Sequence, residues 1–120
     1  MKSSILGLTS DLHYFFYQEP IRMNIGMEGL IGIVINEFGM DPRNGDVYVF
    51  VSRSHKLLKL LHYHEGIFTL YIRKIYHGSF VYPYRDSSHE AYYMDWARFR
   101  RLLRGYAGEI RTENSGHQRR

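Results

Sequence analysis

The fold is decided by residues 46–83, which read DVYVFVSRSHKLLKLLHYHEGIFTLYIRKIYHGSFVYP. Runs rich in leucine, β-branched and aromatic residues alternate here with short segments that contain glycine, serine or histidine. Such runs are typical of strands, and the short segments between them are typical of tight turns. The runs are residues 47–51, 57–63, 67–76 and 80–83. Three or four consecutive strands predict an antiparallel β-meander onto which the rest of the chain packs.

The clearest predicted helix precedes the meander at residues 27–38. Its apolar side chains recur at steps of three and four, which places them on one stripe: Met27, Leu30, Ile31, Val34, Ile35 and Phe38. Gly39 is expected to end the helix in a left-handed conformation. Glycine disfavours a helix interior by up to about 1 kcal/mol. We therefore expect a close approach of the helix to the sheet, in preference to a partner, to explain Gly26, Gly29 and Gly32.

An aromatic run at residues 12–17 (LHYFFY) predicts a further strand, central in the sheet or at a covered edge. Aromatic side chains also form base-stacking platforms in proteins that bind single-stranded nucleic acid. We favour core packing, because these aromatics are contiguous and do not alternate with Lys or Arg. Residues 84–94 form a polar connector to which no element is assigned.

A short C-terminal helix is predicted at residues 96–104. Asp95 is a suitable N-cap, and Gly105 follows at the position of a C-terminal cap. The core face of this helix is expected to consist of Trp96, Phe99, Leu102 and Leu103. The predicted class is thus α+β, with an antiparallel sheet of three to five strands, one amphipathic helix on a face and a short C-terminal helix. We expect one domain, residues 1–108, and a polar tail at residues 109–120.

Composition limits the range of functions. The 120 residues, 44% of them hydrophobic, suffice for one modest core and not for two domains. The longest apolar run, residues 30–35, is far shorter than the roughly 20 residues that cross a bilayer, so we expect a cytoplasmic protein with no membrane contact. Cysteine is absent, which excludes disulfides and thiolate chemistry. The net charge is +4, and twelve of the sixteen cations are Arg, which favours contact with phosphate.

The sequence lacks the groupings that catalysis requires. Its glycines do not have the spacing of a phosphate-binding loop, and no serine occupies a nucleophile elbow. Its acids are scattered through predicted turns, whereas two-metal nucleases and transposases need convergent carboxylates. His62 and His64 point to one face of a strand, where Glu65 or His77 would complete a metal site. We favour hydrogen-bonded sheet histidines, and expect no catalytic residue, no metal site and no cofactor.

A basic surface is the strongest candidate binding site. Arg98, Arg101 and Arg104 repeat every three residues, so they form a row opposite the core residues of their helix. If that helix packs beside the sheet, further cations extend the row: Arg53, Lys56, Arg73 and Lys74. Such a row suits nucleic-acid phosphate, and the alternative is a solvated face that keeps the protein soluble. For the loop of residues 52–56, a solvated turn is favoured over a phosphate contact.

Five segments follow one another in a characteristic order: Gly39-Met40-Asp41-Pro42, Gly45-Asp46-Val47-Tyr48-Val49-Phe50, Leu58-Lys59-Leu60-Leu61, Tyr71-Ile72-Arg73-Lys74 and Gly78-Ser79-Phe80-Val81-Tyr82-Pro83. Together they resemble the small accessory protein (Orf2-like, or TnpB-type) of the insertion-sequence sixty-six family of bacterial transposons. The resemblance covers roughly residues 20–83. The chain departs from the family pattern at residues 21–24, where an acid and a lysine are missing, and at Tyr63, where Trp is common.

The resemblance implies an accessory protein that is encoded beside a separate transposase and assists transposition, a DNA recombination reaction of a mobile element. It supplies no catalytic residues. We accordingly expect a non-enzymatic protein whose partners are the transposase of the same element and DNA. The alternative is a protein-interaction adaptor that makes no direct contact with nucleic acid.

Overall fold

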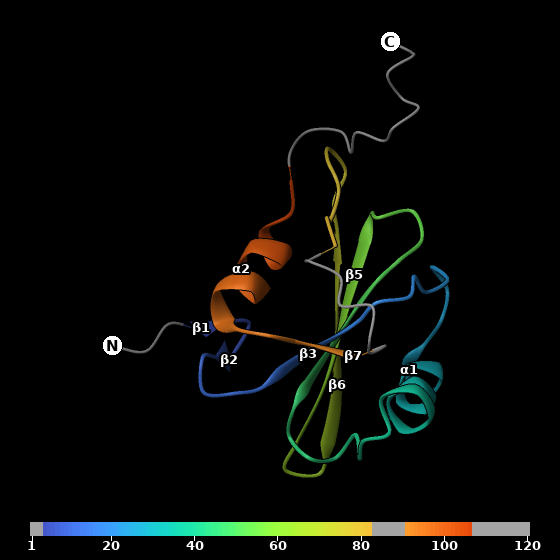
Figure 1. Ribbon diagram of the computed structural model, residues 1–120, viewed down its shortest axis with the longest axis vertical. Coiled ribbons are helices and arrows are strands. Elements are labelled where there is room, and N and C mark those ends of the chain that lie inside the picture. The colour runs from blue at the N-terminus through green and yellow to red at the C-terminus, as the bar shows by residue number, and fades with distance from the viewer. Residues whose placement is uncertain (1–3, 83–90, 107–120) are drawn as a thin grey trace.

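The computed structural model describes residues 4–82 and 91–106, and its main element is a five-stranded sheet in the order β6-β5-β4-β3-β7. The strands are β3 (Tyr14–Tyr17), β4 (Val47–Val51), β5 (Leu57–His64), β6 (Ile67–Lys74) and β7 (Ala91–Met94). A separate hairpin pairs β1 (Ser4–Ile5) with β2 (Leu8–Thr9). Helices α1 (Met27–Ile33) and α2 (Trp96–Arg104) lie on opposite sides of the large sheet (Figure 1). The predicted α+β class is confirmed.

The predicted meander is present as β4, β5 and β6. Val47 pairs with His62 across β4 and β5, and Leu57 pairs with Lys74 across β5 and β6, both in antiparallel ladders. Between β5 and β6, Glu65 and Gly66 adopt positive φ angles of 50° and 83°. A two-residue type I′ hairpin turn needs positive φ at both positions, which explains the glycine.

One pair of neighbouring strands departs from the antiparallel expectation. β3 runs parallel to β4, with Tyr14 beside Val47. Parallel neighbours need a long crossover connection, and here residues 18–46, which include α1, return the chain to the end of the sheet at which β3 begins. β7 pairs antiparallel with the other side of β3 and falls in the connector that received no assignment. The predicted position of β3 inside the sheet is confirmed.

Of the predicted three or four meander strands the structure has three, because the described part of the last run, residues 80–82, forms no strand. The described residues 75–82 contain no strand, and Ser79 instead forms an isolated antiparallel bridge with Tyr106. The Phe80 N–H donates to the His55 carbonyl at 2.8 Å, and the Phe80 side chain is buried in the core beneath α2. Phe80 therefore packs against a loop and a helix end and does not extend the sheet, whereas Val81 is 48% exposed. Pro83 lies outside the described residues.

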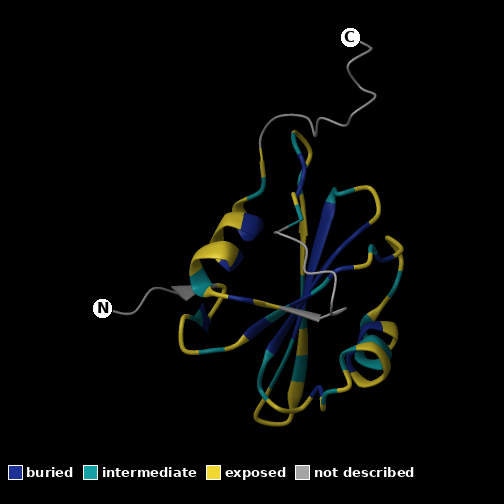
Figure 2. Ribbon diagram, in the orientation of Figure 1, coloured by how far each residue is buried: buried dark blue, intermediate teal, exposed yellow. Residues whose placement is uncertain are grey.

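β4 is buried on both faces because a helix covers each side of the sheet. Val47, Val49 and Val51 belong to the core beneath α2, and Tyr48 and Phe50 belong to the core beneath α1. This division follows from the alternation of side chains along a strand. Figure 2 shows the buried residues concentrated along the strands between the two helices.

The predicted helix at 27–38 is present, with its last turn in a different form. α1 continues into η1 (Val34–Phe38), a π-helical turn that ends at Gly39 with φ of 68°, the predicted left-handed cap. Leu30 and Val34 are fully buried, whereas Ile35 is 52% exposed, so its assignment to the core stripe is wrong. Ile35 follows the fully buried Val34 by about 100° of rotation and lies further still from Leu30, so it falls at the edge of the stripe and not on the buried face.

The helix glycines do not mark a close approach to the sheet. Gly26 is the extended N-cap residue of α1. A Cβ on Gly29 would lie 2.6 Å from Cγ1 of Ile25, which belongs to the segment leading into the helix. A Cβ on Gly32 would meet nothing within 4 Å. The sheet-packing explanation is therefore wrong, and a local contact with Ile25 accounts for Gly29 alone.

The prediction for α2 is confirmed from cap to core face. The Asp95 carboxylate accepts a hydrogen bond of 2.8 Å from the Arg98 backbone N–H. The ring of Phe99 stacks on that of Tyr14, with centroids 4.1 Å apart. Tyr14 and Phe16 are each 1% exposed, as expected for core aromatics and not for a base-stacking platform. The remaining core residues of α2 are Leu102 and Leu103, with Trp96 partly buried.

The predicted polar tail, residues 109–120, lies outside the described residues. Within residues 4–82 and 91–106, no helix combines the length and the apolar content that a membrane span needs.

Candidate nucleic-acid interface

The outer surface of α2 carries four arginines, all of them exposed: Arg98, Arg100, Arg101 and Arg104. Phe99, Leu102 and Leu103 occupy the inner face, so successive rotations of about 100° per residue leave the arginines on the outer face and its two flanks. The acidic residue next to these arginines is the N-cap Asp95, whose carboxylate accepts a hydrogen bond from the Arg98 backbone N–H. The helix therefore presents positive charge to solvent along its whole length.

Arg73 of β6 joins these arginines. In the sheet register Arg73 pairs with Leu58, whose side chain lies in the core beneath α2, so both side chains point to the α2 side of the sheet. A hollow of about 410 Å³ opens between Arg73 and the arginines of α2, and we call it the arginine hollow. Its lining consists of Arg73, Ala97, Arg100, Arg101, Leu103 and Arg104. The structure thus brings together a strand cation and helix cations that are 27 to 31 residues apart in the chain.

No carboxylate neutralises this hollow within the part of the chain that the structure describes. The ion pairs found there join Asp41 to Arg43, and bring His13 near Asp46 and His64 near Glu65. None of them involves an arginine of the arginine hollow. Four guanidinium groups around one concave surface attract an anion, and each is able to donate two parallel hydrogen bonds to a phosphate.

Lys74 lies at the border of this region. It follows Arg73 in β6 and therefore points to the opposite face of the sheet, with its Nζ 5.3 Å from the centre of the Tyr76 ring. A smaller hollow of about 310 Å³ has Arg73, Lys74 and Arg104 in its lining, and it continues from the arginine hollow toward the end of the sheet. Lys74 thus borders the basic surface, while its ammonium lies on the other face of the sheet over Tyr76.

The two cations of the loop at residues 52–56 are placed differently. The Lys56 ammonium donates a hydrogen bond to the Gly78 carbonyl, so it fastens two loops together. Arg53 is exposed, but it lines a separate hollow with Arg22, Met23, Asn24 and Ser54. The Arg53 backbone N–H donates to the Ile21 carbonyl, and Ile21 belongs to the core beneath α1. The structure does not bring Arg53 or Lys56 into the arginine hollow.

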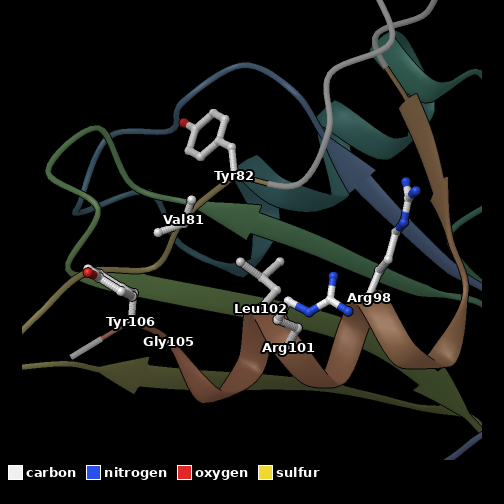
Figure 3. Close-up of a pocket in the computed structure, with 7 residues that line it drawn as sticks. All are labelled: Val81, Tyr82, Arg98, Arg101, Leu102, Gly105 and Tyr106. Carbon is white, nitrogen blue, oxygen red and sulfur yellow. The ribbon is translucent and has the colours of Figure 1, made fainter. Parts of the chain in front are cut away.

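A second hollow, of about 430 Å³, lies on the other flank of α2, and we call it the tyrosine hollow. Its lining consists of Val81, Tyr82, Arg98, Arg101, Leu102, Gly105 and Tyr106. Figure 3 shows Val81, Tyr82 and Tyr106 on one side and Arg98 on the other, with Leu102 and Arg101 between them. Arg101 lines both hollows, so the two are neighbours across the crest of the helix.

Sequence reasoning places Arg100 at the margin of the outer helix face and leaves it out of the candidate site, whereas in the structure it lines the arginine hollow. The available signal was the step of four from Arg100 to Arg104, which places these two on the same side of a helix.

Sequence reasoning also missed Lys59. This lysine lies beneath α1 and is only 4% exposed. The Lys59 ammonium donates to the carbonyls of Met23 and Ile25 at 2.9 and 2.6 Å, and burial lowers its pKa. Lys59 thereby anchors the segment that leads into α1. A single lysine inside a run of leucines was the signal for this structural role.

The histidines of β5 have structural contacts. Nε2 of His62 donates to the Gly45 carbonyl at 3.1 Å, and the His62 ring stacks on the His64 ring with centroids 6.1 Å apart. Burial lowers the pKa of His62, with a smaller contribution from His64. Among the residues that the structure describes, no three His, Asp or Glu side chains are grouped so as to hold a metal ion.

Comparison with known proteins yields one family. The family model described as "IS66 Orf2 like protein" matches residues 12–112. This range includes the whole large sheet, both helices and both hollows. No curated protein and no solved structure matches the chain.

Proposed function

The chain belongs to the IS66 Orf2-like family, an accessory-protein family tied to insertion-sequence transposition, and from this premise we propose that it assists transposition by contacting DNA through the arginine hollow. The proposed role is non-enzymatic, since the family is not a known enzyme family. It places the protein in the cytoplasm, with DNA and the transposase of the same element as partners.

One observation carries this proposal: Arg73, Arg100, Arg101 and Arg104 converge on one concave surface with no carboxylate among the lining residues. These four arginines are not scattered over the surface. They belong to two elements, a strand and a helix, that are held together by a shared core. DNA phosphates carry one negative charge per about 1.7 Å of duplex axis, so a cluster of guanidiniums neutralises several of them at once. Such contacts position a protein on DNA without selecting a base sequence.

The test is a titration of labelled duplex DNA with the protein over a range of salt concentrations. We expect affinity that falls steeply between about 50 and 200 mM salt, because each neutralised phosphate releases counterions. The variant with Arg100, Arg101 and Arg104 of the arginine hollow replaced by Gln should bind all duplex sequences more weakly, with a salt slope smaller by up to about three. A parent protein without measurable affinity at low salt, or a triple variant that binds as the parent does, would end the DNA role of this surface.

A second candidate function, a protein-interaction adaptor, is favoured by the edge strand β6. This strand is eight residues long and, in the described sheet, has a neighbour on one side only. Ile67 and Ile72 are 64% and 56% exposed on it. A long edge strand with exposed apolar residues is suited to pairing with a strand of another protein.

Co-purification with the transposase, with and without DNA from the ends of the element, separates the two functions. Association that survives high salt, needs no DNA and is lost on Ile72→Lys supports the adaptor. Association that requires DNA and disappears as salt is raised supports the DNA contact.

A further inference from the structure

We propose that the tyrosine hollow binds an unpaired nucleotide of single-stranded DNA, with its base stacked on Tyr106 and its phosphates held by Arg98 and Arg101. This inference rests on the proposed DNA contact and specifies the form of DNA that the surface accepts. The tyrosine hollow, at about 430 Å³, falls in the size range of pockets that enclose a small organic ligand.

Tyr106 has a fixed backbone and offers an open ring surface for stacking. Its backbone N–H donates to the Ser79 carbonyl, and its carbonyl accepts from the Ser79 N–H, both at 2.8 Å. The side chain is nevertheless 55% exposed, and its ring stacks on no other ring among the described residues. The pinned backbone lowers the entropy cost of stacking a base on this ring, because only the side-chain torsions of Tyr106 remain to be ordered.

Tyr82 provides a second wall of the hollow, and its ring is held from two sides. The Tyr82 ring lies edge-on to Phe16 at 5.3 Å and close to the His55 ring at 4.9 Å. Nδ1 of His55 is in turn 2.9 Å from the Phe80 carbonyl, so the supporting histidine is oriented as well. With Val81 and Leu102 also in the lining, the hollow combines aromatic and apolar surfaces, which accept the flat face of any base.

The positive charges of the tyrosine hollow suit the phosphate groups of a nucleotide. Arg98 and Arg101 line it, and Arg101 also lines the arginine hollow. A DNA strand that crosses α2 from the arginine hollow to the tyrosine hollow thus stays in contact with arginine side chains. In the tyrosine hollow an aromatic surface lies beside these arginines. Bases of an intact duplex are stacked inside the helix, so only an unpaired base can reach Tyr106. Two arginines beside the aromatic rings favour this anionic occupant over a neutral apolar peptide.

The experiment compares three ligands of equal length by fluorescence anisotropy: oligothymidine, an oligomer of abasic sites with the same phosphates, and a duplex. We expect the parent to prefer oligothymidine to the abasic strand, and Tyr106→Ala to reduce this preference roughly 5- to 150-fold, the contribution of one stacked base. Tyr106→Phe, which keeps the ring, should restore it. Tyr76→Ala is the matched control, because Tyr76 is 77% exposed and does not line the hollow.

The outcomes separate this inference from the proposed function. Duplex binding by the parent without a preference for bases over abasic sites would overturn the inference and leave the DNA contact standing. A preference that Tyr106→Ala does not reduce would overturn it as well. Loss of transposase association in Tyr106→Ala, with no base preference in the parent, would assign the hollow to a protein contact. Absence of all DNA binding would overturn both proposals.

Discussion

Ser79 and Tyr106 exchange two backbone hydrogen bonds, each 2.8 Å long. Ser79 lies in the loop that follows β6, and Tyr106 lies two residues beyond the end of α2, so this pair fastens the C-terminal end of the helix to the sheet. Both hollows on the flanks of α2 depend on that attachment, because β6 contributes Arg73 to one and the following loop contributes Val81 and Tyr82 to the other.

Replacing Gly105 by Ala tests this attachment. Gly105 has φ of 77° and ψ of 173°, a conformation essentially restricted to glycine, and a Cβ there would lie 2.8 Å from Cδ1 of Ile75. We expect Gly105→Ala to lower the free energy of unfolding by about 1–3 kcal/mol, measured by urea denaturation. Ala97→Gly, at an exposed position of the same helix, is the control and should cost at most about 1 kcal/mol. An unchanged midpoint for Gly105→Ala would contradict the described end of α2.

The two neighbours Val34 and Ile35 should respond oppositely to the same substitution. Val34 is fully buried beneath α1, whereas Ile35 is 52% exposed. Val34→Asp places an unpaired charge in the core, so we expect a loss of at least about 3 kcal/mol in the free energy of unfolding. Ile35→Asp should cost less than about 1 kcal/mol. Equal destabilisation by both variants would contradict the exposed position of Ile35 at the edge of the stripe.

The contrast between these two residues shows what sequence periodicity can and cannot predict. The runs that became β4, β5, β6 and α2 were predicted because each is encoded locally, by β-branched residues, a positive-φ turn at Glu65-Gly66 and the Asp95 cap. Steps of three and four admit both Val34 and Ile35 to the stripe, and only the packing of the helix on the sheet decides that the buried face is centred on Leu30 and Val34.

Non-local contacts account for the other differences. The parallel pairing of β3 with β4 depends on the direction in which α1 returns the chain. Phe80 was mistaken for a strand residue because burial by a loop and burial by a sheet select the same apolar side chains. In the site, the spacing along the sequence predicts the helical row. The register of β6 against β5 is needed to show that Arg73 joins it, and the separate hollow that Arg53 lines shows that Arg53 does not.

The buried Lys59 gives a further prediction for stability. Its ammonium satisfies the carbonyls of Met23 and Ile25. Lys59→Met keeps much of the side-chain volume but leaves both carbonyls without this donor, so we expect a loss of about 1–3 kcal/mol in the free energy of unfolding. Faster amide hydrogen exchange in residues 22–26 should accompany the loss. A variant as stable as the parent would mean that desolvation of the ammonium cancels its hydrogen bonds.

His62 should make stability depend on pH. Burial lowers its pKa in the folded state, and the unfolded chain titrates near the ordinary value of about 6.5. Below about pH 6.5 the His62 side chain takes up a proton more readily in the unfolded chain than in the folded protein. The free energy of unfolding therefore decreases as the pH falls from about 6.5 through the lower pKa of His62 in the folded state.

Replacing His62 by Gln, which keeps an N–H donor for the Gly45 carbonyl and does not titrate, should flatten the decline in unfolding free energy between about pH 7 and pH 5. The exposed His77 is the control, since His77→Gln should leave the decline as it is in the parent. An identical pH profile for His62→Gln and the parent would refute the role of His62.

The central claim is that a particular group of arginines, and not net charge, contacts DNA. The most direct measurement compares two charge-matched triple variants in duplex binding at several salt concentrations. One replaces Arg73, Arg100 and Arg104 by Gln and removes most of the arginine hollow while it leaves the lining of the tyrosine hollow intact. The other replaces Arg22, Arg43 and Arg53, three exposed arginines that lie outside both hollows, and removes the same charge.

We predict that the first variant loses up to about three units of salt slope together with most of its affinity, and that the second stays close to the parent. Equal loss in both variants would reduce the DNA contact to unspecific attraction by net charge and contradict the account.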